Sequence, residues 1–102
     1  MPSFIMPLPL VRIQERMQEL DSWAIEGAAD LVKEYLFESF IDSIDFVNQV
    51  AQIAEKQQHH PTILINYTSV RLTLTTHSEH ALSEKDFDLA KAIDDIDKPM
   101  FK

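Results

Sequence analysis

Three histidines of this chain are spaced so that they could support acid–base chemistry. His59 and His60 stand directly before Pro61, and His77 follows a run of alternating apolar residues. Imidazole is the only side chain whose unperturbed pKa lets it both donate and accept a proton near neutral pH. Several imidazoles brought together therefore indicate an acid–base site, unless they bind a metal.

Two other interpretations of the histidines stay open. His77 and His80 have a His-x-x-His spacing that could, with His60, bind zinc. Against zinc, the chain has no cysteine, and the nearby carboxylates Glu79 and Asp86 do not obviously converge. The His-His pair could also be a polar cap at a helix C-terminus, where imidazolium interacts favourably with the helix dipole.

The bulk composition narrows the class of protein. The chain has 102 residues, 45% of them apolar, which is ordinary for one soluble globular domain. The net charge of −8, with no cluster of Lys and Arg, argues against nucleic-acid binding. The single glycine, Gly27, excludes a glycine-rich phosphate loop. With no signal peptide and no apolar run long enough to span a bilayer, we expect a cytoplasmic protein without membrane contact.

The N-terminal part of the chain predicts one helix followed by two strands. Apolar residues at helical spacing favour a helix over residues 9–20. Apolar residues that alternate with polar ones on either side of residues 27–30 favour two short strands. A helix over residues 28–37 is the competing interpretation, because Ala, Leu, Lys and Glu also favour helix.

A second helix should follow these strands. Ser39 with Asp42 forms a plausible N-terminal capping pair, and the helix must stop near Gln58 because Pro61 disfavours helix at the residue before it. Its predicted apolar stripe consists of Phe40, Ile44, Val47, Ala51 and Ala54.

After this helix the apolar period changes to two, which predicts two antiparallel strands. The apolar residues of the two strands lie on the same face only if the numbers of paired residues add up to an odd value. The tightest register of this kind turns at Thr68-Ser69 and places His60 directly opposite His77. Directly opposed residues have Cβ atoms about 4.5–5.5 Å apart, close enough to hold one small molecule together.

A third helix should open after Leu82, with Ser83 as N-cap and Asp86 as the reciprocal capping residue. The predicted order is helix-strand-strand-helix-strand-strand-helix. This is an α+β fold in which three helices pack on one face of a four-stranded antiparallel sheet. We expect residues 1–102 to form a single domain, with residues 1–8 as a flexible N-terminal segment.

The spaced fragments together resemble the pterin-4a-carbinolamine dehydratase family. The pattern Glu55-x-x-x-His59-His60-Pro61, followed by Tyr67, His77 and Asp86, looks like the signature of that family. Weaker fragments fall in the family's order over most of the chain. They are Trp23-x-x-Glu26-Gly27, Phe37-x-x-Phe40, Phe46 through Glu55, Val70-x-x-x-Leu74-x-Thr76-His77 and Leu82-Ser83-x-x-Asp86.

The resemblance implies dehydration of 4a-hydroxytetrahydropterin to the quinonoid dihydropterin, in recycling of a tetrahydrobiopterin-type cofactor. It implies that the pterin is the substrate, that no metal or organic cofactor is used, and that the chain forms a homodimer or homotetramer. The catalytic and pterin-contacting residues would be His59, His60 and His77. The supporting or substrate-binding residues would be Asp86, Pro61 and Thr76.

The same family also implies an alternative, a non-catalytic dimerisation or assembly partner with this fold. The chain departs from the family pattern at two places. His80-Ala81 stands where a glycine usually precedes the Leu-Ser pair, and Ile63 stands at a position that is usually aromatic. Neither departure removes a proton-transfer group.

Overall fold

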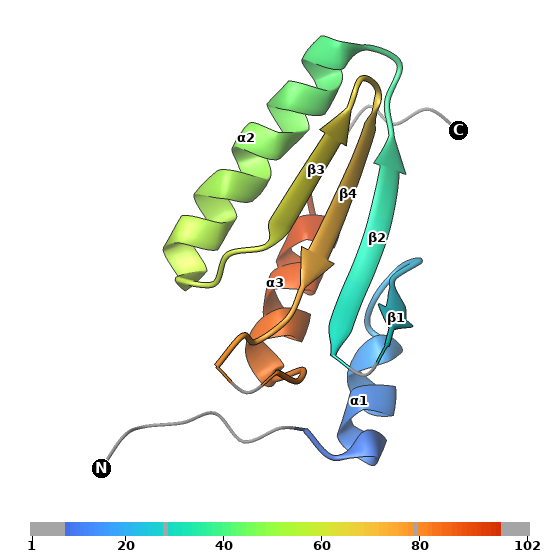
Figure 1. Cartoon of the computed structure of the whole chain (residues 1–102), viewed down its shortest axis with the longest axis vertical. Helices are drawn as coiled ribbons and strands as arrows, with labels where there is room; N and C mark the ends of the chain where they lie inside the picture. Colours follow the sequence, from blue (N-terminus) through green and yellow to red (C-terminus); the bar gives the residue numbers. More distant parts are fainter. Residues whose placement is uncertain (1–7, 28, 79, 97–102) are drawn as a thin grey trace.

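Helices and strands follow one another in the predicted order (Figure 1). The structure is a computed structural model that describes residues 8–27, 29–78 and 80–96. Its elements are α1 (Leu10–Met17), β1 (Ala24–Glu26), β2 (Asp30–Leu36), α2 (Phe40–Gln57), β3 (Thr62–Asn66), β4 (Ser69–Leu74) and α3 (Glu84–Asp94). The strands form one antiparallel sheet in the order β1-β2-β4-β3, which confirms the predicted α+β fold.

The N-terminal part keeps close to the predicted boundaries. α1 begins directly after Pro9 and ends at Met17, three residues before the predicted end. Because β2 is a strand from Asp30, the competing helix over residues 28–37 is wrong. Residues 1–7 of the predicted flexible segment lie outside the described residues, whereas Leu8 packs against the core.

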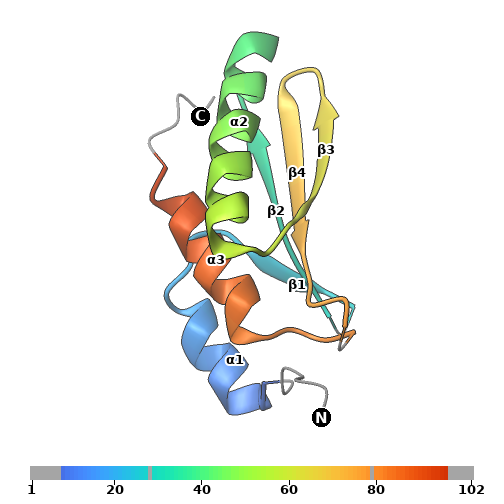
Figure 2. The ribbon, with the colours of Figure 1, turned by 90° about the vertical axis from the view of Figure 1, so that its left-hand side faces the viewer.

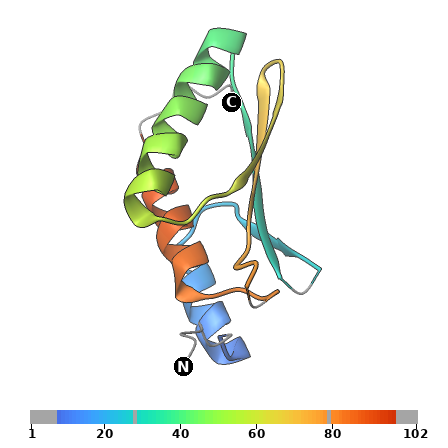
Figure 3. The same cartoon turned by 60° about the vertical axis from the view of Figure 1, so that its left-hand side comes forward.

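The molecule has two layers, with the helices on one face of the sheet (Figures 2 and 3). On the opposite face, Arg71 of β4 donates to the carboxylate of Glu26 at 2.7 and 2.8 Å. This face carries an ion pair, but it also exposes two apolar side chains, Leu36 at 47% and Leu64 at 59%. Within the described ranges, no helix combines the length and the hydropathy needed to cross a bilayer.

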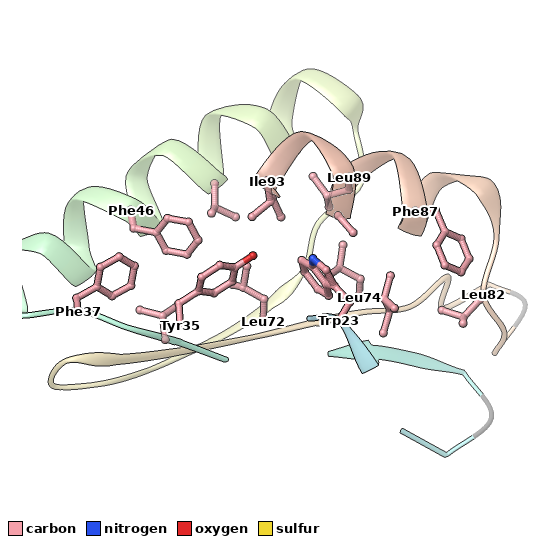
Figure 4. Packing of buried hydrophobic residues seen from close by; sticks show 14 residues of the cluster. Trp23, Tyr35, Phe37, Phe46, Leu72, Leu74, Leu82, Phe87, Leu89 and Ile93 are labelled. Carbon is pink, nitrogen blue, oxygen red and sulfur yellow. The ribbon is translucent and has the colours of Figure 1, made fainter. Parts of the chain in front are cut away.

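The core between the layers is built around aromatic rings from both of them (Figure 4). The ring of Phe46 from α2 lies 4.6 Å from that of Tyr35 and 5.1 Å from that of Phe37, measured between centroids. Trp23 meets Tyr35 edge-on at 6.4 Å. Tilted and edge-on pairs of this kind contribute about 0.5–1.5 kcal/mol beyond the area that they bury.

The face that α2 buries differs from the predicted stripe. The buried residues of this helix are Ser43, Phe46, Val50 and Ala54. Phe40 is 47% exposed and Ala51 is exposed as well, so only Ala54 of the predicted stripe is fully buried. The contacts of Phe46 with Tyr35 of β2 and with Phe37, directly after that strand, decide which face turns inward.

The β3–β4 hairpin has the predicted parity but a different register. Ile63 pairs with Leu72, whereas the predicted partner was Leu74. The turn therefore falls at Tyr67-Thr68, not at Thr68-Ser69. Tyr67 takes a φ of 53°, and a positive φ at the first central residue suits the right-handed twist of a tight hairpin.

This register changes the predicted contact between two histidines. His60 lies two residues before the first residue of β3, and His77 lies three residues after the last residue of β4. Neither residue belongs to the strand ladder, so the predicted direct cross-strand pair of His60 and His77 is wrong. Their positions depend on the turns that flank the hairpin.

Candidate active site

Three segments meet near the open end of the β3–β4 hairpin: the C-terminal end of α2, the end of β4 and the start of α3 (Figure 1). A cavity of about 260 Å³ opens between them. It is lined by Gln58, His59, His60, Thr75, Thr76, His77, Ser78 and Lys85. All three predicted histidines therefore lie on the wall of one cavity.

The end of α2 directs two of these histidines toward the cavity. Gln58 takes the left-handed conformation at φ 53° and donates its N–H to the carbonyl of Glu55 at 3.3 Å. His59 donates its N–H to the carbonyl of Ala54 at 3.1 Å. These two bonds form a Schellman motif, which reverses the chain directly after the helix. The helix end is thus one of the elements that build the site.

A buried carboxylate holds the ring of His59. Asp86 is fully buried, and its Oδ1 lies 2.6 Å from Nε2 of His59. Its Oδ2 accepts from the Thr76 hydroxyl and from the N–H of Ser83, both at 2.9 Å. Because an ionised carboxylate only accepts hydrogen bonds, this contact puts the ring proton of His59 on Nε2 and leaves Nδ1 available.

His60 has an acidic partner of a different kind. Its Nε2 lies 2.5 Å from Oε2 of Glu55, which is in the last turn of α2, five residues earlier in the sequence. Both side chains are mainly exposed, at 58% for His60 and 72% for Glu55. The pair therefore stands in contact with solvent, whereas the side chains of His59 and Asp86 are only 12% and 0% exposed.

His77 is positioned by a short closed loop. Thr76 donates its N–H to the carbonyl of Ala81 at 3.1 Å, and His80 donates its N–H to the carbonyl of His77 at 3.3 Å. His80 takes the left-handed conformation at φ 48°, whereas Ala81, at the position where the family usually has glycine, does not. The His77 side chain is exposed and has no hydrogen-bond partner among the described residues.

The structure thus brings together most of the predicted site. Thr76 lies on the cavity wall, and Asp86 lies directly behind His59. Pro61 is half-buried but does not line the cavity. Sequence reasoning missed the contact of Glu55 with His60, because His60 lies beyond the end of α2 and the chain reverses at Gln58 between the two residues. It also missed Lys85, which gave no signal beyond its place beside Asp86.

The metal interpretation finds no support in the arrangement of side chains. In the part of the chain that the structure describes, no three His, Cys, Asp or Glu side chains are placed to hold a metal ion. His80, which the zinc interpretation required, does not line the cavity.

Chemically, the cavity holds three groups able to move protons. One imidazole has a fixed tautomer, one pairs with an exposed carboxylate, and one is unpaired among the described residues. An elimination needs a base and an acid on the same substrate, and a wall with several imidazoles can supply both.

Comparison with known proteins agrees with this site. Residues 6–96 match the family described as Pterin 4 alpha carbinolamine dehydratase. A protein of Sulfolobus acidocaldarius is 40% identical over 84 residues, which are 82% of this chain and 91% of that protein. One of a Nostoc species is 43% identical over 86 residues, or 84% and 91% of the two chains. Both bear the provisional name pterin-4-alpha-carbinolamine dehydratase.

Two solved structures share the fold. A transcriptional coactivator/pterin dehydratase from Brucella melitensis superposes with a TM-score of 0.81 at 31% identity, covering 86% of this chain and 95% of that one. A pterin dehydratase-like protein, identified as a RuBisCO assembly factor in the alpha-carboxysome, gives 0.63 at 26% identity, covering 74% and 89%. With a family match over nearly its whole length, this chain belongs to the pterin-4-alpha-carbinolamine dehydratase family.

Proposed function

We propose that this protein dehydrates 4a-hydroxytetrahydropterin to the quinonoid dihydropterin by general acid–base catalysis with its histidines. The observation that carries the proposal is the convergence of His59, His60 and His77 on one cavity, with His59 fixed by the buried Asp86. The names of the relatives support the same reaction class. The pterin is then the substrate, and the reaction needs no metal or organic cofactor.

The reaction can be written with this chain's own groups. One neutral imidazole takes the proton from N5, and the electron pair of the N5–H bond forms the C4a=N5 double bond. The C4a–O bond breaks, and a protonated imidazole gives its proton to the departing hydroxide, which leaves as water. No electron is gained or lost overall. Positioned acids and bases of this kind contribute about 10²- to 10⁴-fold each.

The contacts suggest how the histidines divide the work. His60 and His77 are the more exposed rings and are the acid–base pair in this proposal. His59 is held from behind by Asp86, so its ring keeps one orientation while its free Nδ1 can contact the pterin. The proposal also includes recycling of a tetrahydrobiopterin-type cofactor in the cytoplasm as the setting of the reaction.

A dehydration assay on freshly generated 4a-hydroxytetrahydropterin tests the proposal. His60→Ala and His77→Ala should each lower the rate by about 10²- to 10⁴-fold. His80→Asn is the matched control, because it removes a neighbouring exposed histidine that does not line the cavity, while asparagine tolerates the left-handed conformation at this position. This variant should keep the wild-type rate. Activity should also survive dialysis against a chelator. A wild-type protein no faster than buffer would refute the proposed activity.

A second function is favoured by a different surface. Phe40, Ile41 and Tyr67 are 47%, 66% and 70% exposed around the start of α2 and the hairpin tip. Exposed apolar side chains of this size suit an assembly surface, and the carboxysome relative is identified as an assembly factor. Size-exclusion chromatography with light scattering should then show a homodimer or homotetramer, and a clean monomer at micromolar concentration would contradict it.

A further inference from the structure

One cation lies on the wall of the histidine cavity. Lys85, in the first turn of α3, is exposed and shares the cavity with the three histidines. The other described lining residues are histidines, threonines, a serine and a glutamine, so none of them carries a carboxylate. Lys85 is therefore the only lysine or arginine among the described lining residues.

The carboxylates next to Lys85 in sequence are engaged elsewhere. Glu84 accepts from Arg12 at 2.8 Å and from Arg16 at 2.5 Å. Both oxygens of Asp86 are occupied by His59, Thr76 and Ser83. Neither carboxylate turns toward the ammonium group, so its charge remains uncompensated among the described residues.

This condition is unusual for the basic residues of this chain. Five described Lys and Arg residues form ion pairs with carboxylates: Arg12, Arg16, Lys33, Arg71 and Lys91. Within the described ranges only Lys56 and Lys85 form none, and Lys56 lies on α2 away from the histidine cavity. A chain with a net charge of −8 thus keeps one unpaired cation where its candidate substrate binds.

We propose that Lys85 is a specificity-determining residue, selecting pterins whose side chain carries an anionic group such as a carboxylate or a phosphate. The inference rests on the proposed function. The cavity, at about 260 Å³, is smaller than the roughly 300–1,000 Å³ of typical ligand sites, so a ring held among the histidines leaves its substituent near the mouth. There the ammonium group meets it and also attracts anionic ligands toward the site.

Calorimetric binding of two stable pterins tests this inference. Pterin-6-carboxylate and 6-hydroxymethylpterin share the ring system and differ in side-chain charge. The wild type should bind the carboxylate about fivefold more tightly, the upper range for a solvent-exposed ion pair. Lys85→Met should abolish this preference without weakening the neutral pterin. Lys56→Met, the matched control, should retain it, and about 0.5 M salt should reduce it.

The possible outcomes separate the two proposals. Binding of both pterins with equal affinity to the wild type, or an equal loss for both in Lys85→Met, overturns the role of Lys85 but leaves the dehydratase proposal standing. Failure of the wild type to bind either pterin overturns both. Inorganic phosphate alone is a third ligand, and if it binds as tightly as the carboxylate, Lys85 is an anion site unrelated to the pterin side chain.

Discussion

Two carboxylates of α3, the fully buried Asp86 and the largely buried Asp94, perform different tasks at the two ends of the same helix. Asp86 is fully buried and accepts hydrogen bonds from the Thr76 hydroxyl and a backbone N–H, with the His59 ring against its other oxygen. The Asp94 side chain is 13% exposed and pairs with the ammonium group of Lys33 at 3.1 Å. It also accepts from the indole N–H of Trp23 at 2.8 Å.

The difference lies in what each carboxylate holds. The partners of Asp94 make further contacts inside the fold. The ammonium group of Lys33 also donates to the carbonyl of Asp21 and lies 4.8 Å from the ring centroid of Tyr35. Asp86 binds a ring whose other nitrogen remains available at a cavity. One carboxylate therefore stabilises the packing of α3 on the sheet, and the other orients a group for chemistry.

Loss of the Asp94 carboxylate should have the largest effect on stability. Asp94→Ala leaves the ammonium group of Lys33 buried without a counter-charge, which costs about 3–5 kcal/mol. Urea unfolding followed by circular dichroism measures the free energy of unfolding. Asp94→Asn, which keeps an acceptor for Trp23, should lose less and should retain the wild-type rate of dehydration per folded molecule. A lowered rate in folded Asp94→Asn would contradict the division of tasks.

A double variant checks the cause of that loss. Lys33→Met combined with Asp94→Asn removes both charges, so that no isolated ion remains buried. The double variant should be more stable than Asp94→Ala alone. If it is less stable, the ion pair itself, and not the avoidance of a lone charge, supplies the stabilisation.

Replacement of Asp86 should act mainly on catalysis. In Asp86→Asn the amide can still accept from Thr76 and Ser83, but its NH₂ group can donate to Nε2 of His59 and so shift the ring proton to Nδ1. Loss of such an orienting partner costs about 10- to 100-fold in activity. The turnover number and its pH profile measure the effect. The pH profile should change, since the ring proton of His59 moves, whereas a purely structural defect would leave the profile unchanged. An unchanged profile would assign Asp86 to packing.

The contrast between these carboxylates also shows what the sequence could predict. Local signals were reliable: Ser39 caps α2 by accepting from the N–H of Asp42 at 3.1 Å, and Asp86 accepts from the N–H of Ser83 as predicted. The role of Asp94 was not predicted, because its partners are more than 50 residues away and no spacing rule connects them.

The geometry of the site was predicted only in part. Convergence of the histidines followed from the family pattern, but the direct contact of His60 with His77 required a register that Thr-Ser does not specify. The hairpin instead turns at Tyr67, a residue type without a preference for positive φ. The pairing of His59 with Asp86 depends on the left-handed backbone conformation of Gln58. From the sequence one expects glycine at such a position, so Gln58 gave no signal.

The buried hydroxyl of Tyr35, which lies close to Asp94, should make the free energy of unfolding fall at alkaline pH. Burial raises the pKa of the Tyr35 hydroxyl well above its ordinary value of 10.0, and the charge of Asp94 raises it further. As the pH rises, the unfolded chain thus loses the Tyr35 proton before the folded chain does. The contribution of Tyr35 to the free energy of unfolding is complete below about pH 10 and declines above it by up to about 1.4 kcal/mol per pH unit. Tyr35→Phe should flatten this decline in urea titrations at about pH 9 to 11. Tyr67→Phe, an exposed control, should keep the decline.

A third carboxylate of α3, Glu84, should give the smallest effect, because its side chain is partly exposed to solvent. Hydrogen bonding from Arg12 lowers the pKa of Glu84, with a further contribution from Arg16, and burial opposes the change. A lowered folded-state pKa stabilises the fold above the ordinary value of 4.5, and this contribution disappears as the pH falls through the folded-state value. The Glu84 side chain is 44% exposed, so screening by solvent limits the contribution to less than about 1 kcal/mol. Glu84→Gln should therefore be slightly less stable than the wild type at neutral pH and equal to it in acid. A loss as large as that of Asp94→Ala would show that burial is not what separates these carboxylates.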